Sequence, residues 1–415
     1  MDNKIIYKII ISIKLSISFY TCIYFFSNPI IPDNFVDIDS KFKYYFPKLW
    51  KIKNELEIGY FEKYINDCKL LKNYNRKKPK NKIEFPFLSV CICSHNSMEY
   101  IEKAILSILN QSFQNFEIII IDDYSTDDSY NIFNKYQYLG ERFRIINHQE
   151  NFGIYRSRVD AIIYSKGEYI LFVDSDDMLL NEYLFEILYS YTFIYHFDII
   201  EYLVLYQAEG KNNLVRPSKD YQVLTHIHNY SKNIISQPEL SNIIFYIPQT
   251  NNYSSVICRT LWNKMYKKEI FLNSIKYIGK KFYTNSYLNY GEDTIMNILN
   301  FHFAKNYTNI NIYGYMYNVR KNSISRFTKN IKKRYVLNLG IYYYLKLLYK
   351  YIKEFNINRQ VLYLEFVLFN KQIFFLKLND PHFFKKKMRK IFDAIIKDDN
   401  ASFFFKKYIK NLSKY

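Results

Sequence analysis

Four short apolar runs alternate with amphipathic stretches between residues 87 and 177, and this alternation constrains the fold more than any other feature of the chain. Runs of this kind are typical of strands covered on both faces. The stretches between them carry apolar residues at helical spacing. The expected strands are Leu88–Cys93, Glu117–Ile121, Phe143–Ile146 and Tyr169–Val173, and the expected helices are Tyr100–Asn110, Ser129–Tyr138 and Tyr155–Ser165.

This order of elements indicates an α/β fold with a mostly parallel, Rossmann-like sheet and helices on both faces. In such sheets, ligands bind beyond the carboxyl ends of the strands. Three expected strands end in polar clusters, at Ser94–Asn96, Asp122–Asp123 and Asp174–Asp177. We therefore expect acids and amides from three strand ends to meet in one crevice.

Composition sets wider limits on the chain. Its 415 residues, 49% of them hydrophobic, suffice for one large domain with appendages or for two domains. The net charge of +19 is compatible with nucleic acid, a membrane surface or phosphorylated substrates. Because the basic residues are spread along the chain, we expect no nucleic-acid partner and interpret most lysines as solvated near an acidic lipid surface.

The five cysteines are odd in number and give no disulfide framework. Cys91 and Cys93 lie two apart in an expected strand, so they face the same side of the sheet. We interpret them as core thiols or as neighbours of a ligand, because C-x-C alone is too short for a structural zinc site.

The N-terminal segment is mostly apolar, and its cleanest part is Leu15–Ile31, with 17 uncharged residues. That length is near the lower limit for a spanning helix. Lysines precede this run and aspartates follow it, which places the rest of the chain in a lumen. We expect a signal anchor at 1–31 and a single-pass type II protein of the endoplasmic reticulum or Golgi. The alternative is a helix packed on a cytoplasmic or peripheral protein.

Motifs in the α/β stretch resemble, in order and spacing, those of the inverting family 2 glycosyltransferases of the GT-A fold. The close matches are Leu88-Ser-Val-Cys-Ile-Cys-Ser-His-Asn96, Ser107–Ile118, Ile121-Asp-Asp-Tyr-Ser-Thr-Asp127, Asn151-Phe-Gly153 with Arg158, and Lys166–Asp177. Weaker matches follow at Leu261–Lys264 and Gly291–Asp293. The chain departs from the family pattern at Cys93, His95 and Val159, where Pro, Tyr and Asn are usual.

On this resemblance we expect a stem at 32–85, a GT-A domain at 86–328 and a helical C-terminal region at 329–415. The enzyme would transfer a hexose or N-acetylhexosamine from a nucleotide-diphosphate donor, with UDP expected, to a hydroxyl of a glycan, lipid or protein. A divalent cation, Mn²⁺ or Mg²⁺, is the expected cofactor. Asp176 and Asp174 are the expected metal ligands, and Asp177 is expected to cap the next helix.

The resemblance also implies the remaining site residues. Nucleotide-sugar binding is expected of Cys93, Ser94, His95, Asn96, Asp123, Arg158, Asp174, Ser175, Trp262 and Lys264. In this set, Asp123 would accept a hydrogen bond from a nucleobase N–H, Lys264 would neutralise phosphate and Trp262 would stack on a sugar. An inverting transfer needs a general base, for which Asp293 is expected and Glu292 is the second choice. Tyr317, Arg320 and Ser323 lie where the family often has a similar stretch.

Two other functions stay open. A non-catalytic nucleotide-sugar- or glycan-binding protein on a degenerate GT-A scaffold would be expected to lose the D-x-D pattern or the late acid, and both are present. Another α/β nucleotide enzyme, such as a nucleotidyltransferase, would be expected to carry a glycine-rich phosphate loop after the first strand. Cys93–Ser97 contains no glycine.

Overall fold

A computed structural model describes residues 47–49, 85–208, 214–215, 235–237, 240, 260–284, 288, 291–320, 331–355, 393 and 397. The expected anchor at 1–31 and most of the expected stem at 32–85 lie outside these residues. Among the helices that are described, none is both long and apolar enough to cross a bilayer.

The first part of the described chain shows the expected alternation of strands and helices. In chain order it contains β1 (Leu88–Ser94), α6 (Ile101–Leu109), β2 (Phe116–Asp122), α7 (Ser129–Asn134), the 3₁₀ segment η2 (Gln137–Arg142), β3 (Phe143–Asn147), α8 (Ile154–Tyr164) and β4 (Tyr169–Phe172). Only the helix expected over Ser129–Tyr138 differs clearly, because α7 ends at Asn134. Gly140 then takes a φ of 60°, which interrupts helical geometry inside η2.

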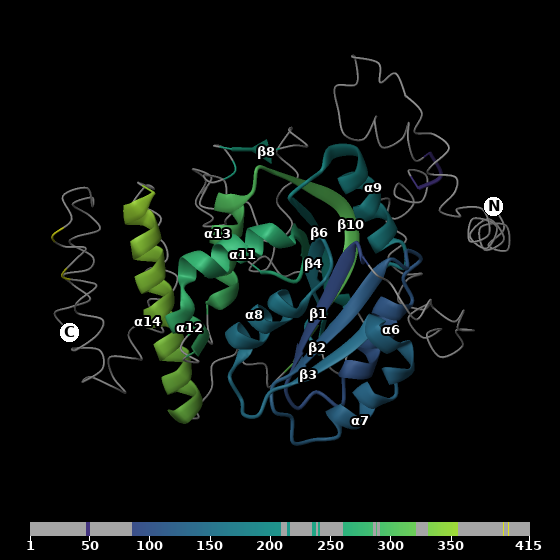
Figure 1. Cartoon of the computed structure of the whole chain (residues 1–415), viewed down its shortest axis with the longest axis horizontal. Helices are drawn as coiled ribbons and strands as arrows, with labels where there is room; N and C mark the ends of the chain where they lie inside the picture. The colour runs from purple at the N-terminus through teal and green to yellow at the C-terminus, as the bar shows by residue number, and fades with distance from the viewer. Residues whose placement is uncertain are drawn as a thin grey trace, which may run out of the picture.

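The second part widens the sheet and adds helices. It contains β5 (Met178–Leu179), α9 (Leu184–Tyr195), β6 (Ile199–Ala208), β7 (Leu214–Val215), β8 (Ile235–Ser236), β9 (Lys264–Lys267), α11 (Lys268–Ile278), α12 (Lys280–Thr284), α13 (Glu292–Phe303), β10 (Asn306–Val319) and α14 (Ile331–Glu354). The described strands form one sheet in the order β3-β2-β1-β4-β9-β6-β10-β5, with β7 on β6 and β8 on β10 (Figure 1).

The sheet is mixed, with a parallel half that carries the expected strand ends. β3, β2, β1 and β4 are parallel neighbours. β9 is antiparallel to both β4 and β6, whereas β6 and β10 run parallel to each other. The carboxyl ends of β1, β2 and β4 therefore lie along one edge of the sheet.

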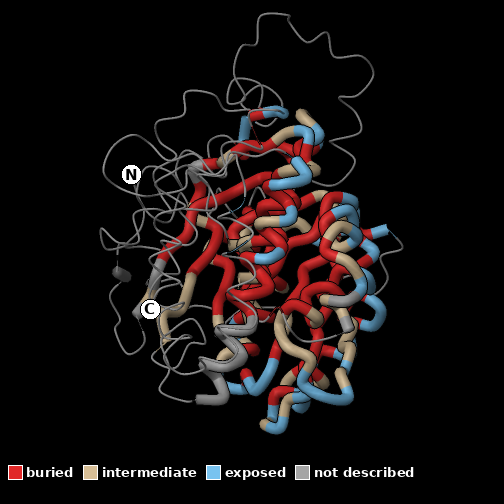
Figure 2. The backbone as a smooth tube through the Cα atoms, turned by 90° about the vertical axis from the view of Figure 1, so that its left-hand side faces the viewer, coloured by how far each residue is buried: buried red, intermediate tan, exposed pale blue. Residues whose placement is uncertain are grey.

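Alternate residues of the strands feed two hydrophobic cores, one on each face. In β2, Ile119 and Ile121 pack in a core with residues of α8, α11, α13 and α14, whereas Ile118 and Ile120 pack in a core with residues of α6 and α9. Figure 2 shows that buried residues fill the interior of the described chain and that exposed segments lie at its periphery. Burial on both faces explains why the β2 sequence is continuously apolar rather than alternating.

The long helix α14 packs beside α13 and contributes to the same core (Figure 1). Tyr344, Leu345, Leu348 and Tyr351 are fully buried there. This part of the C-terminal region, expected to be helical, is a helix docked on the α/β unit. Nearly all of residues 356–415 lie outside the described part of the chain.

Candidate active site

The polar ends of β1, β2 and β4 meet at one edge of the sheet. The Asp123 backbone N–H donates to the Ser94 carbonyl at 2.8 Å, which ties the end of β2 to the end of β1. The hydroxyls of Ser97 and Ser175 lie 2.8 Å apart, which ties the end of β1 to the loop after β4. The structure thus brings together the three clusters that the sequence places at strand ends.

Arg158 lies at the centre of the acidic part of this edge. It projects from α8, is 3% exposed, and donates from Nη1 to Glu292 Oε1 at 2.8 Å. The same Nη1 pairs with Asp293, and Nη2 lies 3.5 Å from Asp174 Oδ1. One buried arginine therefore joins the D-x-D loop to the two candidate bases at the start of α13.

Burial and charge act in opposite senses on this cluster. Burial tends to lower the pKa of Arg158, but Glu292 and Asp174 outweigh it and raise that pKa, so the guanidinium stays charged. Burial raises the pKa of Glu292, although Arg158 opposes the shift. The side chain of Asp293 is 25% exposed and that of Glu292 is 10% exposed. Asp293 is thus the more accessible of the two carboxylates.

The loop after β4 concentrates three carboxylates. Asp176 forms an ion pair with Arg320, and its backbone carbonyl accepts a hydrogen bond from the Asn318 side chain at 2.6 Å. Burial, followed by the charge of Asp174, raises the pKa of Asp176, while Arg320 opposes the rise. Negative charge at this loop is therefore only partly compensated by the protein.

The expected capping role of Asp177 is wrong. The strand β5, not a helix, follows it directly. Its buried carboxylate instead accepts hydrogen bonds from the Tyr315 hydroxyl and the Asn318 N–H, both at 2.8 Å. Tyr315 in turn receives the Asp174 N–H at 3.0 Å, so Asp177 anchors the D-x-D loop to β10.

Asp174 and Asp176 are the residues of this edge that could hold an Mg²⁺ or Mn²⁺ ion, which would take its other ligands from diphosphate oxygens and water. Two carboxylates on one loop, whose charge the protein compensates only in part, are oxygen donors of the kind that such an ion uses. Nowhere in the described part of the chain do three or more His, Cys, Asp or Glu residues gather in a way that could hold a metal. A cation here would therefore depend on ligands from outside the protein.

The β1 end forms a turn that is fixed by contacts to the β2 end. Asn96 adopts a φ of 51°, in the left-handed region that Asn tolerates. Its N–H donates to Ser125 Oγ at 2.9 Å, and its Oδ1 accepts the Thr126 N–H at 2.7 Å. His95 is exposed, with Nδ1 2.8 Å from the Asp123 carbonyl. Cys93 is half-buried, and burial raises the pKa of its thiol.

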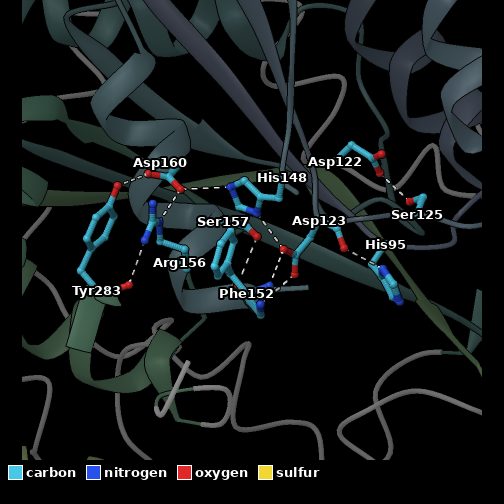
Figure 3. A network of polar contacts seen from close by, with 11 residues as sticks. His95, Asp122, Asp123, Ser125, His148, Phe152, Arg156, Ser157, Asp160 and Tyr283 are labelled. Carbon is cyan, nitrogen blue, oxygen red and sulfur yellow. Dashed lines mark hydrogen bonds and ion pairs between the residues drawn. The ribbon is translucent and has the colours of Figure 1, made fainter. Parts of the chain in front are cut away.

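Asp123 belongs to a polar network that the sequence reasoning did not include (Figure 3). Its Oδ1 lies 2.7 Å from His148 Nδ1 and accepts the Phe152 N–H at 2.9 Å, while Oδ2 accepts the Gly153 N–H at 2.8 Å. His148 Nε2 lies 3.0 Å from Asp160 Oδ2. The sequence carried a signal for this residue, because His148 lies two positions beyond the third expected strand, at the same edge of the sheet as the other polar strand ends.

The structure also corrects the roles expected for two residues near β9. Trp262 is 5% exposed, and its ring stacks on Tyr315 and Tyr317 with centroids 4.7 Å and 5.4 Å away. It is therefore a core residue and presents no face to a sugar.

Lys264 is likewise unavailable to a phosphate. Its side chain is 0% exposed, donates to Asn263 Oδ1 at 2.8 Å and lies 3.5 Å from Glu201 Oε1. This lysine neutralises a buried glutamate inside the sheet. In a sequence, Trp and Lys serve as core or site residues equally well, and here burial decides between the two roles.

The mostly parallel sheet and the acids at its strand ends define an α/β domain of the GT-A-like type. Residues 89–273 match the family model described as glycosyl transferase family 2. This stretch of the chain is similar to the family 2 glycosyltransferases.

Several bacterial proteins share this similarity. The chain is 39% identical over 92 residues to the putative teichuronic acid biosynthesis glycosyltransferase TuaG of Bacillus subtilis, covering 22% of this chain and 36% of that protein. It is 28% identical over 190 residues to the cholesterol galactosyltransferase of Borreliella burgdorferi, covering 45% and 49%. Each match thus spans at most about half the relative's length. Among solved structures, S. aureus TarS in complex with UDP-GlcNAc aligns with a TM-score of 0.43 at 19% identity, covering 64% of this chain and 72% of that chain.

Proposed function

We propose that this chain is a glycosyltransferase that transfers a sugar from a nucleotide-diphosphate donor, UDP-linked, to an acceptor hydroxyl by inverting displacement. The observation that carries the proposal is the buried Arg158, which joins Asp174 of the D-x-D loop to Glu292 and Asp293. The residue that would face the sugar donor and the residues that would activate the acceptor hydroxyl therefore lie at one edge of the sheet. The match of residues 89–273 to the family 2 glycosyltransferase model supports the same conclusion.

In this proposal each cluster has one task. The Ser94–Asn96 turn and Asp123 bind the nucleobase, and Asp174 and Asp176 face the diphosphate. A divalent cation bound by these two aspartates would neutralise the departing nucleoside diphosphate as a Lewis acid. Asp293 takes the proton of the acceptor hydroxyl as that oxygen attacks the sugar carbon.

The ion pairs of the site suggest how it is ordered before the donor binds. Arg158 holds Asp293 beside the D-x-D loop, so the base is positioned close to the donor-binding carboxylates. Arg320 screens Asp176, whose charge would otherwise face Asp174 and Asp177 without compensation. Placing the reacting groups in advance lowers the entropic cost of the transfer.

The test is turnover of a panel of nucleotide-sugars by the full chain, with Mn²⁺ or with chelator. We expect metal-dependent turnover of one UDP-sugar, reduced roughly 100-fold or more in Asp176→Asn and Asp293→Asn. Glu141→Gln is the matched control, since this exposed carboxylate precedes β3, at the opposite edge of the sheet. If the chain binds a nucleotide-sugar in a metal-dependent way but transfers its sugar to no acceptor, a binding protein on a degenerate scaffold would be favoured instead.

A further inference from the structure

His148 lies at the only described strand end of the parallel half that the proposed mechanism leaves unused. It follows β3, its N–H donates to the Asp122 carbonyl at 2.9 Å, and its side chain is 6% exposed. Its ring lies between two carboxylates that belong to different elements, Asp123 after β2 and Asp160 on α8 (Figure 3). A buried polar ring held at both nitrogens is a fixed part of the structure rather than a surface group.

We propose that His148 is a positioning residue that sets the nucleobase selectivity of the site, by holding the Asp123 carboxylate in one orientation and in acceptor-only form. The inference rests on the proposed function, in which Asp123 binds the base. His148 itself touches no substrate in this proposal and acts through Asp123.

The first step of the argument is the protonation of the ring. Nδ1 lies 2.7 Å from Asp123 Oδ1 and Nε2 lies 3.0 Å from Asp160 Oδ2. A carboxylate oxygen accepts, so each ring nitrogen must carry a hydrogen, which makes the ring an imidazolium. Consistent with this, although burial lowers the pKa of His148, its hydrogen bonds to the two aspartates raise that pKa to about 9. The imidazolium in turn donates a charge-assisted hydrogen bond to the Asp123 carboxylate.

The second step is the orientation of Asp123. Oδ1 receives two donors, from His148 and from the Phe152 N–H, whereas Oδ2 receives only the Gly153 N–H among the described residues. Because a carboxylate oxygen can accept two hydrogen bonds, Oδ2 retains one acceptor position. Three donors from two sides fix the plane of the carboxylate, so this position has a defined direction.

The third step is chemical selectivity. An oriented carboxylate accepts from an imino N–H, which uracil has at N3 and guanine at N1. Cytosine and adenine carry a lone pair at the corresponding nitrogen and would meet the carboxylate with two acceptors. A site built around a fixed acceptor rejects such a mismatch strongly, because one polar group is left unpaired.

The far side of the imidazolium is anchored as well. Asp160 also accepts from Arg156 Nε and from the Tyr283 hydroxyl, both at 2.6 Å. The Arg156 guanidinium lies 3.6 Å from the centre of the Tyr283 ring on α12. The two carboxylates of this network are balanced by two cations, the His148 ring and the Arg156 guanidinium. Side chains of α8 and α12 thus fix His148 through Asp160.

The test is calorimetric titration of the full chain with UDP, GDP, CDP and ADP in the presence of Mn²⁺. Two variants separate the two ring bonds. The side-chain nitrogen of Asn occupies the place of Nδ1, so His148→Asn keeps a donor to Asp123, whereas the nitrogen of Gln occupies the place of Nε2, so His148→Gln keeps only the donor to Asp160. His196→Asn is the control, since this exposed residue at the end of α9 has a φ of 50° that Asn tolerates.

We expect the wild-type chain to bind UDP better than CDP, and His148→Gln to weaken UDP binding roughly 10-fold or more while CDP binding changes little. His148→Asn should restore most of the lost selectivity. A merely structural role would lower the thermal stability of both variants alike and leave the UDP-to-CDP ratio unchanged. An unchanged ratio in folded His148→Gln would overturn the inference and leave the proposed function standing.

If no nucleotide binds the wild-type chain, both the proposed function and the inference fail. Should His148→Gln not fold, Tyr283→Phe takes its place. This variant removes only the hydroxyl donated to Asp160 and loosens the anchor behind the ring. We then expect a smaller loss, about 2- to 5-fold, in the same UDP-to-CDP ratio. A ratio equal to that of the wild-type chain would count against the inference.

Discussion

At the residue scale, burial and pairing separate residues that bind ligands from residues that hold the sheet together. Lys264 illustrates the difference, because its ammonium group contacts Asn263 and Glu201 and is fully buried. Lys264→Met should leave Glu201 without its cation and lower the free energy of unfolding by roughly 2–4 kcal/mol. Denaturant titration measures this loss.

The same variant distinguishes a structural lysine from a phosphate ligand. Under conditions where Lys264→Met is folded, we expect its affinity for UDP to stay within about twofold of the wild-type value. A large loss of UDP affinity with little loss of stability would restore the role that the sequence suggested.

At the scale of elements, one of the contacts that fasten the segment between β3 and α8 to the end of β2 is a titrating side chain, His148. The pKa of His148, lowered by burial but raised more strongly by Asp123 and Asp160, is about 9, above its ordinary value of 6.5. Its stabilising contribution is therefore complete below about pH 6.5 and is lost as the pH rises through about 9. We expect wild-type stability to fall by up to about 3 kcal/mol more than that of His148→Asn across this range.

The measurement is the unfolding free energy from denaturant titrations of both proteins between pH 6 and pH 10, the range set by these two pKa values. Subtracting one unfolding free energy from the other at each pH removes the contribution of the other groups that titrate in this range. Parallel pH profiles would show that His148 is neutral in the folded protein and that its two ring contacts are not both charge-assisted.

At the scale of the whole molecule, α14 shares one core with the sheet. Tyr344 on this helix is fully buried, and a Cβ on Gly291 would lie 3.1 Å from Cγ of its ring. Tyr344→Ala should therefore destabilise the entire α/β unit, by about 3–5 kcal/mol, in a single unfolding transition. The exposed Lys353→Ala on the same helix should change stability by no more than about 0.5 kcal/mol.

Calorimetry of the full chain checks this prediction. Two separate transitions, with only the smaller one shifted in Tyr344→Ala, would show instead that α14 folds independently of the sheet. Because Tyr344 packs over Gly291, which directly precedes Glu292 and Asp293, we also expect the variant to disturb the start of α13.

The sequence by itself determined the parallel half of the sheet and the acids at its strand ends. Continuous apolar runs such as Ile118–Ile121 can be satisfied only by burial on both faces, so local pattern and fold agree there. After β2 the local pattern predicted too long a helix, because α7 ends at Asn134 and the separate 3₁₀ segment η2 begins at Gln137.

Only the tertiary structure decided which polar residues form the site and which support it. Arg158 reaches Glu292 across 134 residues of sequence, and His148 joins the Asp123 carboxylate after β2 to the Asp160 carboxylate on α8. Asp177 ties the D-x-D loop to β10 instead of capping a helix, and Trp262 and Lys264 lie in the core. The physical reason is that desolvation and charge pairing depend on neighbours that are distant in the chain, and these neighbours meet only when the sheet has formed.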